Sequence, residues 1–152
     1  MRVLGIITAR GGSKRLPNKN TKILGDKPLI AWTIESALKA KYIDKVIVSS
    51  DNSEIIAISK KFGAEVPFVR PEELSSDSAS SVSVLLHALD WFRAKGVLFD
   101  YIVLLQPTSP FRKEGLIDSV LLQAINNPDV DMVVTVKPLL VNPLYNIFVE
   151  SS

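Results

Sequence analysis

The 152-residue chain contains no cysteine, and this absence removes several kinds of chemistry at once. Without thiols there is no disulfide, no thiolate metal site and no cysteine nucleophile. The single histidine, His87, stands inside an expected helix, so the sequence offers neither a metal-spaced histidine pair nor a Ser–His–Asp arrangement. Any chemistry of this chain therefore has to come from charged, hydroxyl and amide groups.

Long apolar runs are absent too. No segment reaches the roughly 18 consecutive apolar residues of a membrane span, and the short run after Arg2 is unlike a secretory signal because it leads straight into charged residues. With 47% hydrophobic residues and a net charge of +2, the composition fits one domain with a single core over residues 1–152. We expect a cytoplasmic protein with no membrane partner, and so mild a net charge does not demand a nucleic-acid partner.

Positive charge is concentrated near the N-terminus, where residues 9–25 contain five basic side chains and no acid. The string TARGGSKRLPNKN at residues 8–20 directly follows an apolar run at residues 3–7. Gly11 and Gly12 let backbone N–H groups approach a ligand closely because they carry no Cβ. Such a loop suits a polyanion, for example a nucleoside triphosphate, although a solvated surface turn would have the same composition.

The loop matches neither of the two common phosphate-binding patterns. The pattern G-x-x-x-x-G-K-[ST] does not follow Gly11 or Gly12. The pattern G-x-G-x-x-G has to open a helix, whereas here Pro17 and the polar residues after it postpone the next helix. A nucleotide site would therefore need support from other parts of the chain.

Apolar runs alternate with segments of helical period along the whole chain. Strands are expected at residues 3–7, 45–50, 101–105, 132–136 and 145–150, with a short extended piece at 66–69, and helices at 29–38, 52–62, 79–94 and 114–126. Strands that are apolar throughout are typical of a sheet covered on both faces, and their alternation with helices predicts βαβ units. The expected fold class is α/β, with three layers (αβα) and a mostly parallel, Rossmann-like sheet.

Ligands of such sheets bind outside the carboxyl ends of the strands, and the expected strands here end in polar groups. Asp51 follows the second strand, and the string QPTSPFR follows the strand at 101–105. Because proline fixes φ, the two prolines make this turn stiff. The turn could shape a pocket, or it could be a rigid connection.

Arg70 precedes a serine-rich stretch that runs into the third helix, and Ser81 stands at the start of that helix. They could meet a phosphate and a base edge. Alternatively, Arg70 is a surface charge, and Asp77, Ser78 or a neighbouring serine caps the helix.

Taken together, five strings resemble the acylneuraminate cytidylyltransferases, the CMP-sialic acid synthetase family. In chain order they are ARGGSKRLPNKN, GDKPLIAWTIESAL, VIVSSDNSEI, VPFVRPEELSSDSASS and LLQPTSPFR, and the resemblance covers nearly all of the chain. It implies transfer of a cytidylyl group from CTP to the anomeric hydroxyl of a nine-carbon acidic sugar, with release of pyrophosphate. It also implies the nucleotide-diphospho-sugar transferase type of the fold.

The resemblance implies a role for each matching residue. Asn20 and Ser81 would read the cytosine, and Lys19 would lie close to the reacting α-phosphate. The implied catalytic residues are Arg10, Lys14 and Lys19. The implied nucleotide-binding residues are Arg10, Gly11, Gly12, Ser13, Lys14, Lys19, Asn20, Arg70 and Ser81. The residues implied to face the sugar are Gln106, Thr108, Ser109 and Arg112.

Members of the resembled family extend well beyond the point that corresponds to Ser152. Their C-terminal part pairs two subunits and carries the aspartates that hold the metal. The resemblance therefore implies Mg²⁺ as cofactor with ligands beyond residue 152, no metal ligand within this chain, and a homodimer of the full-length protein. We expect residues 1–152 to be a single nucleotidyltransferase domain without that C-terminal part. This domain is expected to bind CTP but to turn over poorly.

The QPTSP string favours the sialic acid branch, with legionaminic and pseudaminic acids, over the synthetases for the eight-carbon sugar Kdo. Those synthetases carry an aspartate in the corresponding string. Remaining alternatives are a guanylyltransferase acting on a related acid sugar and a non-catalytic nucleotide-binding module. A nucleic-acid-binding patch would interleave aromatics with the charge, and residues 8–22 contain none.

Overall fold

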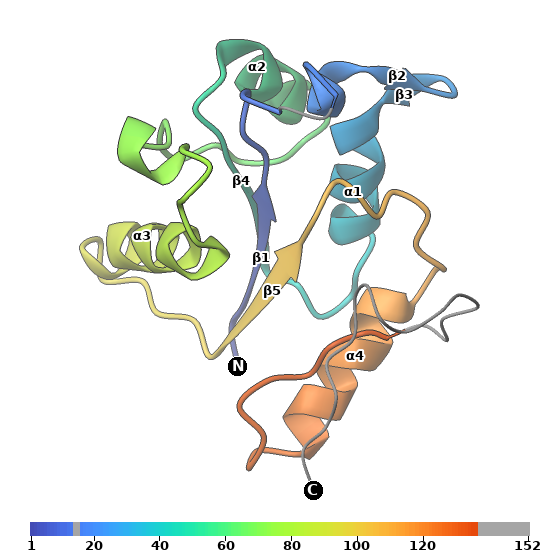
Figure 1. Cartoon of the computed structure of the whole chain (residues 1–152). Coiled ribbons are helices and arrows are strands. Elements are labelled where there is room, and N and C mark those ends of the chain that lie inside the picture. Colours follow the sequence, from blue (N-terminus) through green and yellow to red (C-terminus); the bar gives the residue numbers. More distant parts are fainter. Residues whose placement is uncertain (14–15, 137–152) are drawn as a thin grey trace, which may run out of the picture.

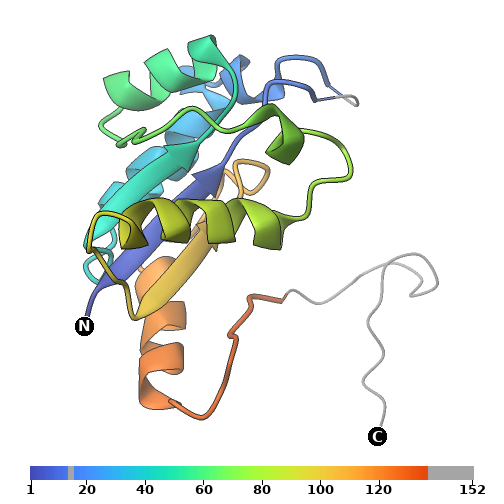
Figure 2. The ribbon, with the colours of Figure 1, turned by 90° about the vertical axis from the view of Figure 1, so that its left-hand side faces the viewer.

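The computed structural model describes residues 1–13 and 16–136. Its centre is a parallel sheet with the strand order β4-β1-β5. In Figure 2 the three strands, teal, blue and yellow, lie side by side and point the same way. Ile6 of the central strand pairs with Ile47 on one side and with Leu104 on the other. The strands are β1 (Val3–Thr8), β4 (Lys45–Ser49) and β5 (Tyr101–Leu105).

Helices cover both faces of the sheet, which confirms the predicted α/β fold with three layers (Figures 1 and 2). Side chains of β1 alternate between two cores: Val3 and Ile7 pack on one face, and Leu4 and Ile6 pack on the other. Full burial of one such side chain stabilises the fold by about 1.5–3 kcal/mol. The first core is shared with α1 (Leu29–Leu38), α2 (Ser53–Lys61) and α4 (Leu116–Asn126), and the second with α3 (Ser81–Arg93).

Side-chain caps fix where two of the helices begin. The Asn52 Oδ1 accepts a hydrogen bond from the Ile55 N–H at 3.0 Å and starts α2, while the Ser80 Oγ accepts from the Ser83 N–H at 3.0 Å and starts α3. Helix α2 stops before Gly63, whose φ of 91° is easily adopted only by glycine. Of the caps that the sequence allowed for the third helix, the neighbouring serine Ser80 is therefore the one used, and not Asp77.

Four short elements were not anticipated. Strands β2 (Ile23–Leu24) and β3 (Lys27–Pro28) form an antiparallel pair before α1. Helix α1 holds this pair, because Trp32 Nε1 donates to the Leu24 carbonyl at 2.9 Å and Lys27 binds Glu35 at 2.8 Å. Single 3-10 turns are η1 (Lys19–Thr21) and η2 (Glu72–Leu74).

Next to the extended piece expected at 66–69, Glu65 forms a single parallel bridge with Ile47. One expectation about strands needs correction. The strand predicted at 132–136 is wrong: these residues have no ladder partner in the described part of the chain, and Met132 and Val136 are 76% and 88% exposed. An apolar run becomes a strand only when a sheet edge pairs with it. The strand predicted at 145–150 lies outside the described residues.

None of the helices in the described residues is both long and apolar enough to cross a bilayer.

Candidate functional site

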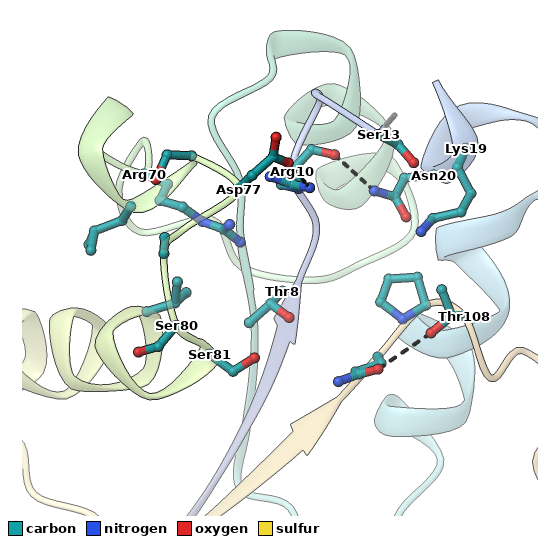
Figure 3. A pocket seen from close by; sticks show the side chains of 16 residues that line it. Thr8, Arg10, Ser13, Lys19, Asn20, Arg70, Asp77, Ser80, Ser81 and Thr108 are labelled. Atoms are coloured by element: carbon teal, nitrogen blue, oxygen red, sulfur yellow. Dashed lines mark hydrogen bonds and ion pairs between the residues drawn. The ribbon is translucent and has the colours of Figure 1, made fainter. Parts of the chain in front are cut away.

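A cavity of about 310 Å³ lies at the end of the sheet to which the strands point (Figure 3). Its walls come from the loop after β1, from Arg70, from the loop that leads into α3 and from the turn after β5. A second cavity of about 480 Å³ adjoins it, because both are lined by Arg10, Ser13, Ser76 and Asp77. This is where parallel sheets of this class bind ligands.

Arg10 joins the first loop to the loop before α3. Its guanidinium donates to the Asp77 carboxylate at 2.6 Å and to the Ser75 carbonyl at 3.4 Å. Both side chains of the ion pair are partly exposed, so the pair contributes little to stability. A multiply charged anion that enters the cavity could therefore compete with Asp77 for Arg10.

Arg70 is a cation buried beside the cavity, and only 5% of its surface is exposed. Its Nε donates to the Ser49 Oγ at 3.0 Å, and a second nitrogen donates to the Ser49 carbonyl. Burial lowers the pKa of Arg70 from its ordinary value, and nearby Asp51 partly opposes this shift. Among the described residues its side chain donates to neutral acceptors, and a buried cation so bonded favours an anionic ligand close by.

Asn20, only 5% exposed, presents an acceptor without a partner among the described residues. Its Nδ2 donates to the Arg10 carbonyl at 3.1 Å, while its Oδ1 is buried and makes no hydrogen bond. A buried polar atom without a partner is costly, so its presence at a cavity wall indicates a ligand that donates to it.

The two adjacent glycines differ in their surroundings. A Cβ on Gly11 would lie 3.0 Å from the Asn52 side chain, whereas a Cβ on Gly12 would meet nothing within 4 Å. The Gly11 N–H donates to the Asp51 Oδ1 at 2.9 Å. Gly11 is therefore needed for packing against the start of α2, and Gly12 leaves its side of the loop open to a ligand.

The turn after β5 contributes two polar side chains to the cavity wall. Gln106 and Thr108 line it, and the Thr108 Oγ1 lies 3.4 Å from the Gln106 Oε1. Arg112 instead donates to the Thr33 Oγ1 at 3.0 Å and to the Gln106 carbonyl at 2.7 Å. Burial lowers the pKa of the Arg112 guanidinium from its ordinary value.

The structure brings most of the sequence-predicted site residues together. Neither Ser109 nor Arg112 is among the residues that line either cavity, and Lys14 lies outside the described residues. Sequence reasoning missed Thr8, the last residue of β1, and gave Asp77 only a capping role. The predicted residues that line the first cavity are Arg10, Ser13, Lys19, Asn20, Arg70, Ser81, Gln106 and Thr108. Gly11 and Gly12 line the second cavity.

The class of protein follows from the site. Three cations, several hydroxyls and one amide oxygen without a partner among the described residues surround a cavity at the carboxyl edge of a parallel sheet. The chain is an α/β protein whose cavity has the charge and the free acceptor that suit a polyanionic ligand with hydrogen-bond donors. Its sequence matches the model of the family described as cytidylyltransferase over residues 4–144. The chain belongs to the cytidylyltransferase family.

Individual relatives agree with this family. The chain is 41% identical, over 94% of its length, to a CMP-N,N'-diacetyllegionaminic acid synthase of Legionella pneumophila. It is 47% identical, over 73% of its length, to an N-acylneuraminate cytidylyltransferase of Escherichia coli. The chain spans 61% of the length of the first protein and 25% of the second.

A solved structure shares the fold. It is a CMP:2-keto-3-deoxy-manno-octonic acid synthetase complexed with CTP, which superposes with a TM-score of 0.70 and 24% identity. The match covers 84% of this chain and 49% of that one.

Proposed function

We propose that this protein transfers the cytidylyl group of CTP to the anomeric hydroxyl of a nine-carbon acidic sugar, giving a CMP-sugar and pyrophosphate. The observation that carries the proposal is the convergence of Arg10, Lys19 and Arg70 on one cavity whose wall also holds the unpaired Asn20 oxygen. The names of the relatives support it, because both concern the activation of nine-carbon acidic sugars.

In this proposal the triphosphate occupies the side of the cavity formed by the first loop. Arg10, Ser13 and the open face at Gly12 contact the β- and γ-phosphates. Lys14, which lies outside the described residues, stays a predicted phosphate ligand. Cationic side chains and free N–H groups stabilise phosphate oxygens through charge-assisted hydrogen bonds. Lys19 lies nearest to the α-phosphate.

The base occupies the side formed by Asn20 and the start of α3. Cytosine carries an exocyclic amino group, which donates hydrogen bonds and suits the Asn20 Oδ1. Ser81 at the start of α3 reads another base edge, and Arg70 holds the nucleotide from the side.

The reaction needs no covalent enzyme intermediate. The sugar hydroxyl attacks the α-phosphorus and releases its proton to solvent, the bond from the α-phosphorus to the α–β bridging oxygen breaks, and pyrophosphate leaves. Such transfer depends on in-line positioning and on neutralising charge that develops on the phosphate oxygens. Lys19 and Arg10 supply that charge, while Gln106, Thr108 and Ser109 orient the acidic sugar.

We propose Mg²⁺ as the metal of the reaction, where it would offset the charge of the triphosphate. No three acidic or histidine side chains gather in residues 1–13 and 16–136, so these residues do not form a protein cage for the ion. Its protein ligands are expected outside them. We also propose a cytoplasmic protein that acts as a homodimer.

The direct test is product formation. The protein is incubated with CTP, Mg²⁺ and a panel of acidic sugars: sialic, legionaminic and pseudaminic acids, and Kdo as the eight-carbon comparison. Phosphorus NMR should show a new phosphodiester and free pyrophosphate with a nine-carbon acid. Turnover with Kdo alone, or with GTP in place of CTP, would contradict the proposal.

A further inference from the structure

The turn between Gln106 and Arg112 is fastened to α1 by its last side chain. Arg112 donates through one terminal nitrogen to the Thr33 Oγ1 at 3.0 Å and through the other to the Gln106 carbonyl at 2.7 Å. Thr33 is completely buried in α1. The guanidinium therefore bridges a fixed point of the helix layer and the first residue of the turn.

The same carbonyl closes the turn. The Gln106 oxygen also accepts the Ser109 N–H at 3.2 Å, so both of its acceptor positions are used. Beside it, the Phe111 ring lies 5.9 Å from the Trp32 ring of α1. The turn thus contacts α1 through both Arg112 and Phe111. Of these two side chains, Arg112 is the one that also binds the Gln106 carbonyl.

We propose that Arg112 is a positioning residue: it sets the place of Gln106 and Thr108 in the cavity wall and makes no contact with the acidic sugar. This inference rests on the proposed function, in which these two residues face the sugar. Arg112 is absent from the lining of either cavity, and its terminal nitrogens already bind acceptors of the protein.

The planar guanidinium makes this bridge specific. Its two terminal nitrogens diverge in a fixed geometry and reach two acceptors at once, whereas a lysine ammonium is a single point on a flexible stem. Loss of the Arg112 guanidinium or of the Thr33 hydroxyl should therefore loosen the same turn. Arg112 and Thr33 should therefore behave as one unit, although only Arg112 carries a charge that a sugar carboxylate could use.

The experiment compares Arg112→Lys, Thr33→Val and Thr33→Ser with the unchanged protein. Valine keeps the shape of threonine but removes the acceptor, while serine keeps the hydroxyl and should restore the bridge. Arg93→Lys is the matched control, because Arg93 makes an exposed ion pair with Asp90 on α3 at 2.9 Å.

The first measurement is amide hydrogen exchange at Ser109, which needs no substrate. Arg112→Lys and Thr33→Val should both speed this exchange by about tenfold, and Thr33→Ser and Arg93→Lys should leave it unchanged. Unchanged exchange in both of the first two variants would overturn the bridge, whatever the protein's activity.

The second measurement is steady-state kinetics. Arg112→Lys and Thr33→Val should each raise the KM for the acidic sugar by about tenfold and leave the KM for CTP within about twofold. The double variant should be no worse than either single variant, since both remove one bridge. Normal sugar kinetics in Thr33→Val beside a large loss in Arg112→Lys would overturn the inference and assign a direct sugar contact to Arg112.

A protein that turns over no acidic sugar would count against the proposed function. The exchange at Ser109 would still decide whether the bridge exists. Faster exchange without any change in sugar kinetics would show that the bridge is real and that the positioning role is wrong.

Discussion

The Arg10 guanidinium lies 2.6 Å from the Asp77 carboxylate, and this pair stands at the boundary between the two cavities of the site. Arg10 belongs to the loop that we assign to the triphosphate, and Asp77 belongs to the loop before α3. In the free protein, a carboxylate therefore binds the cation that a phosphate would use.

Asp77→Asn should tighten triphosphate binding by about two- to fivefold, because it removes a negative charge from the wall of an anion site and a competitor for Arg10. Titration calorimetry with CTP and with inorganic tripolyphosphate, which lacks a base, would measure the change. Asp90→Asn is the control, because it removes an exposed carboxylate near the end of α3 that lines neither cavity. Weaker binding by Asp77→Asn would instead show that the aspartate holds Arg10 in its binding position.

The two glycines should separate packing from ligand approach. Gly11→Ala would push a methyl group to 3.0 Å from the Asn52 Cβ and should lower the free energy of unfolding by about 1–3 kcal/mol. The methyl group of Gly12→Ala would meet nothing within 4 Å, so this variant should keep the melting temperature of the unchanged protein. It should nevertheless bind CTP less tightly. Thermal unfolding and CTP titration check both statements. A Gly12→Ala protein with full CTP affinity would show that no phosphate approaches this backbone.

Lys19→Ala should reduce turnover more than CTP affinity, since its charge acts mostly on the transition state. Loss of one charge-assisted contact costs about 1.5–3 kcal/mol, which corresponds to a loss in kcat of roughly 10–100-fold. Lys22→Ala removes an exposed charge from the same segment and should have little effect. Equal losses in kcat and CTP affinity would reduce Lys19 to a plain binding role.

Asn20→Ala should weaken CTP binding by about tenfold and leave UTP binding nearly unchanged. The bond from the Asn20 Nδ2 to the Arg10 carbonyl fixes the orientation of the amide, so that its oxygen remains the free acceptor. Cytosine offers an amino group to that oxygen, whereas uracil offers another acceptor. Titration of both nucleotides with each protein measures the difference, and equal losses for CTP and UTP would remove Asn20 from base reading.

Local patterns predicted much of this fold. The bounds expected for residues 29–38 and 101–105 agree with α1 and β5, because period and flanking residues decide where such elements begin and end. Polar residues that follow two of the expected strands, β1 and β5, line the cavity, as the rule for parallel sheets predicted. The segment 132–136 shows the limit: its strand propensity is high, but pairing depends on a distant edge.

The contacts of single arginines were harder to predict. All three arginines expected at a ligand have protein partners: Arg10 binds Asp77, Arg70 binds Ser49, and Arg112 binds Thr33. These partners lie 67, 21 and 79 residues away in the chain. Which acceptor an arginine reaches depends on how the loops run between the elements, and local sequence patterns do not predict the course of those loops.

The central claim is that this cavity takes CTP, and comparative nucleotide titration tests it most directly. With Mg²⁺ present, we predict that CTP binds at least about tenfold more tightly than UTP, because cytosine donates a hydrogen bond to the buried Asn20 oxygen and uracil offers an acceptor there. We also predict that CTP binds more tightly than GTP or ATP, whose amino groups lie elsewhere on a larger ring. Equal affinity for the four nucleotides, or tighter binding of GTP, would contradict the account.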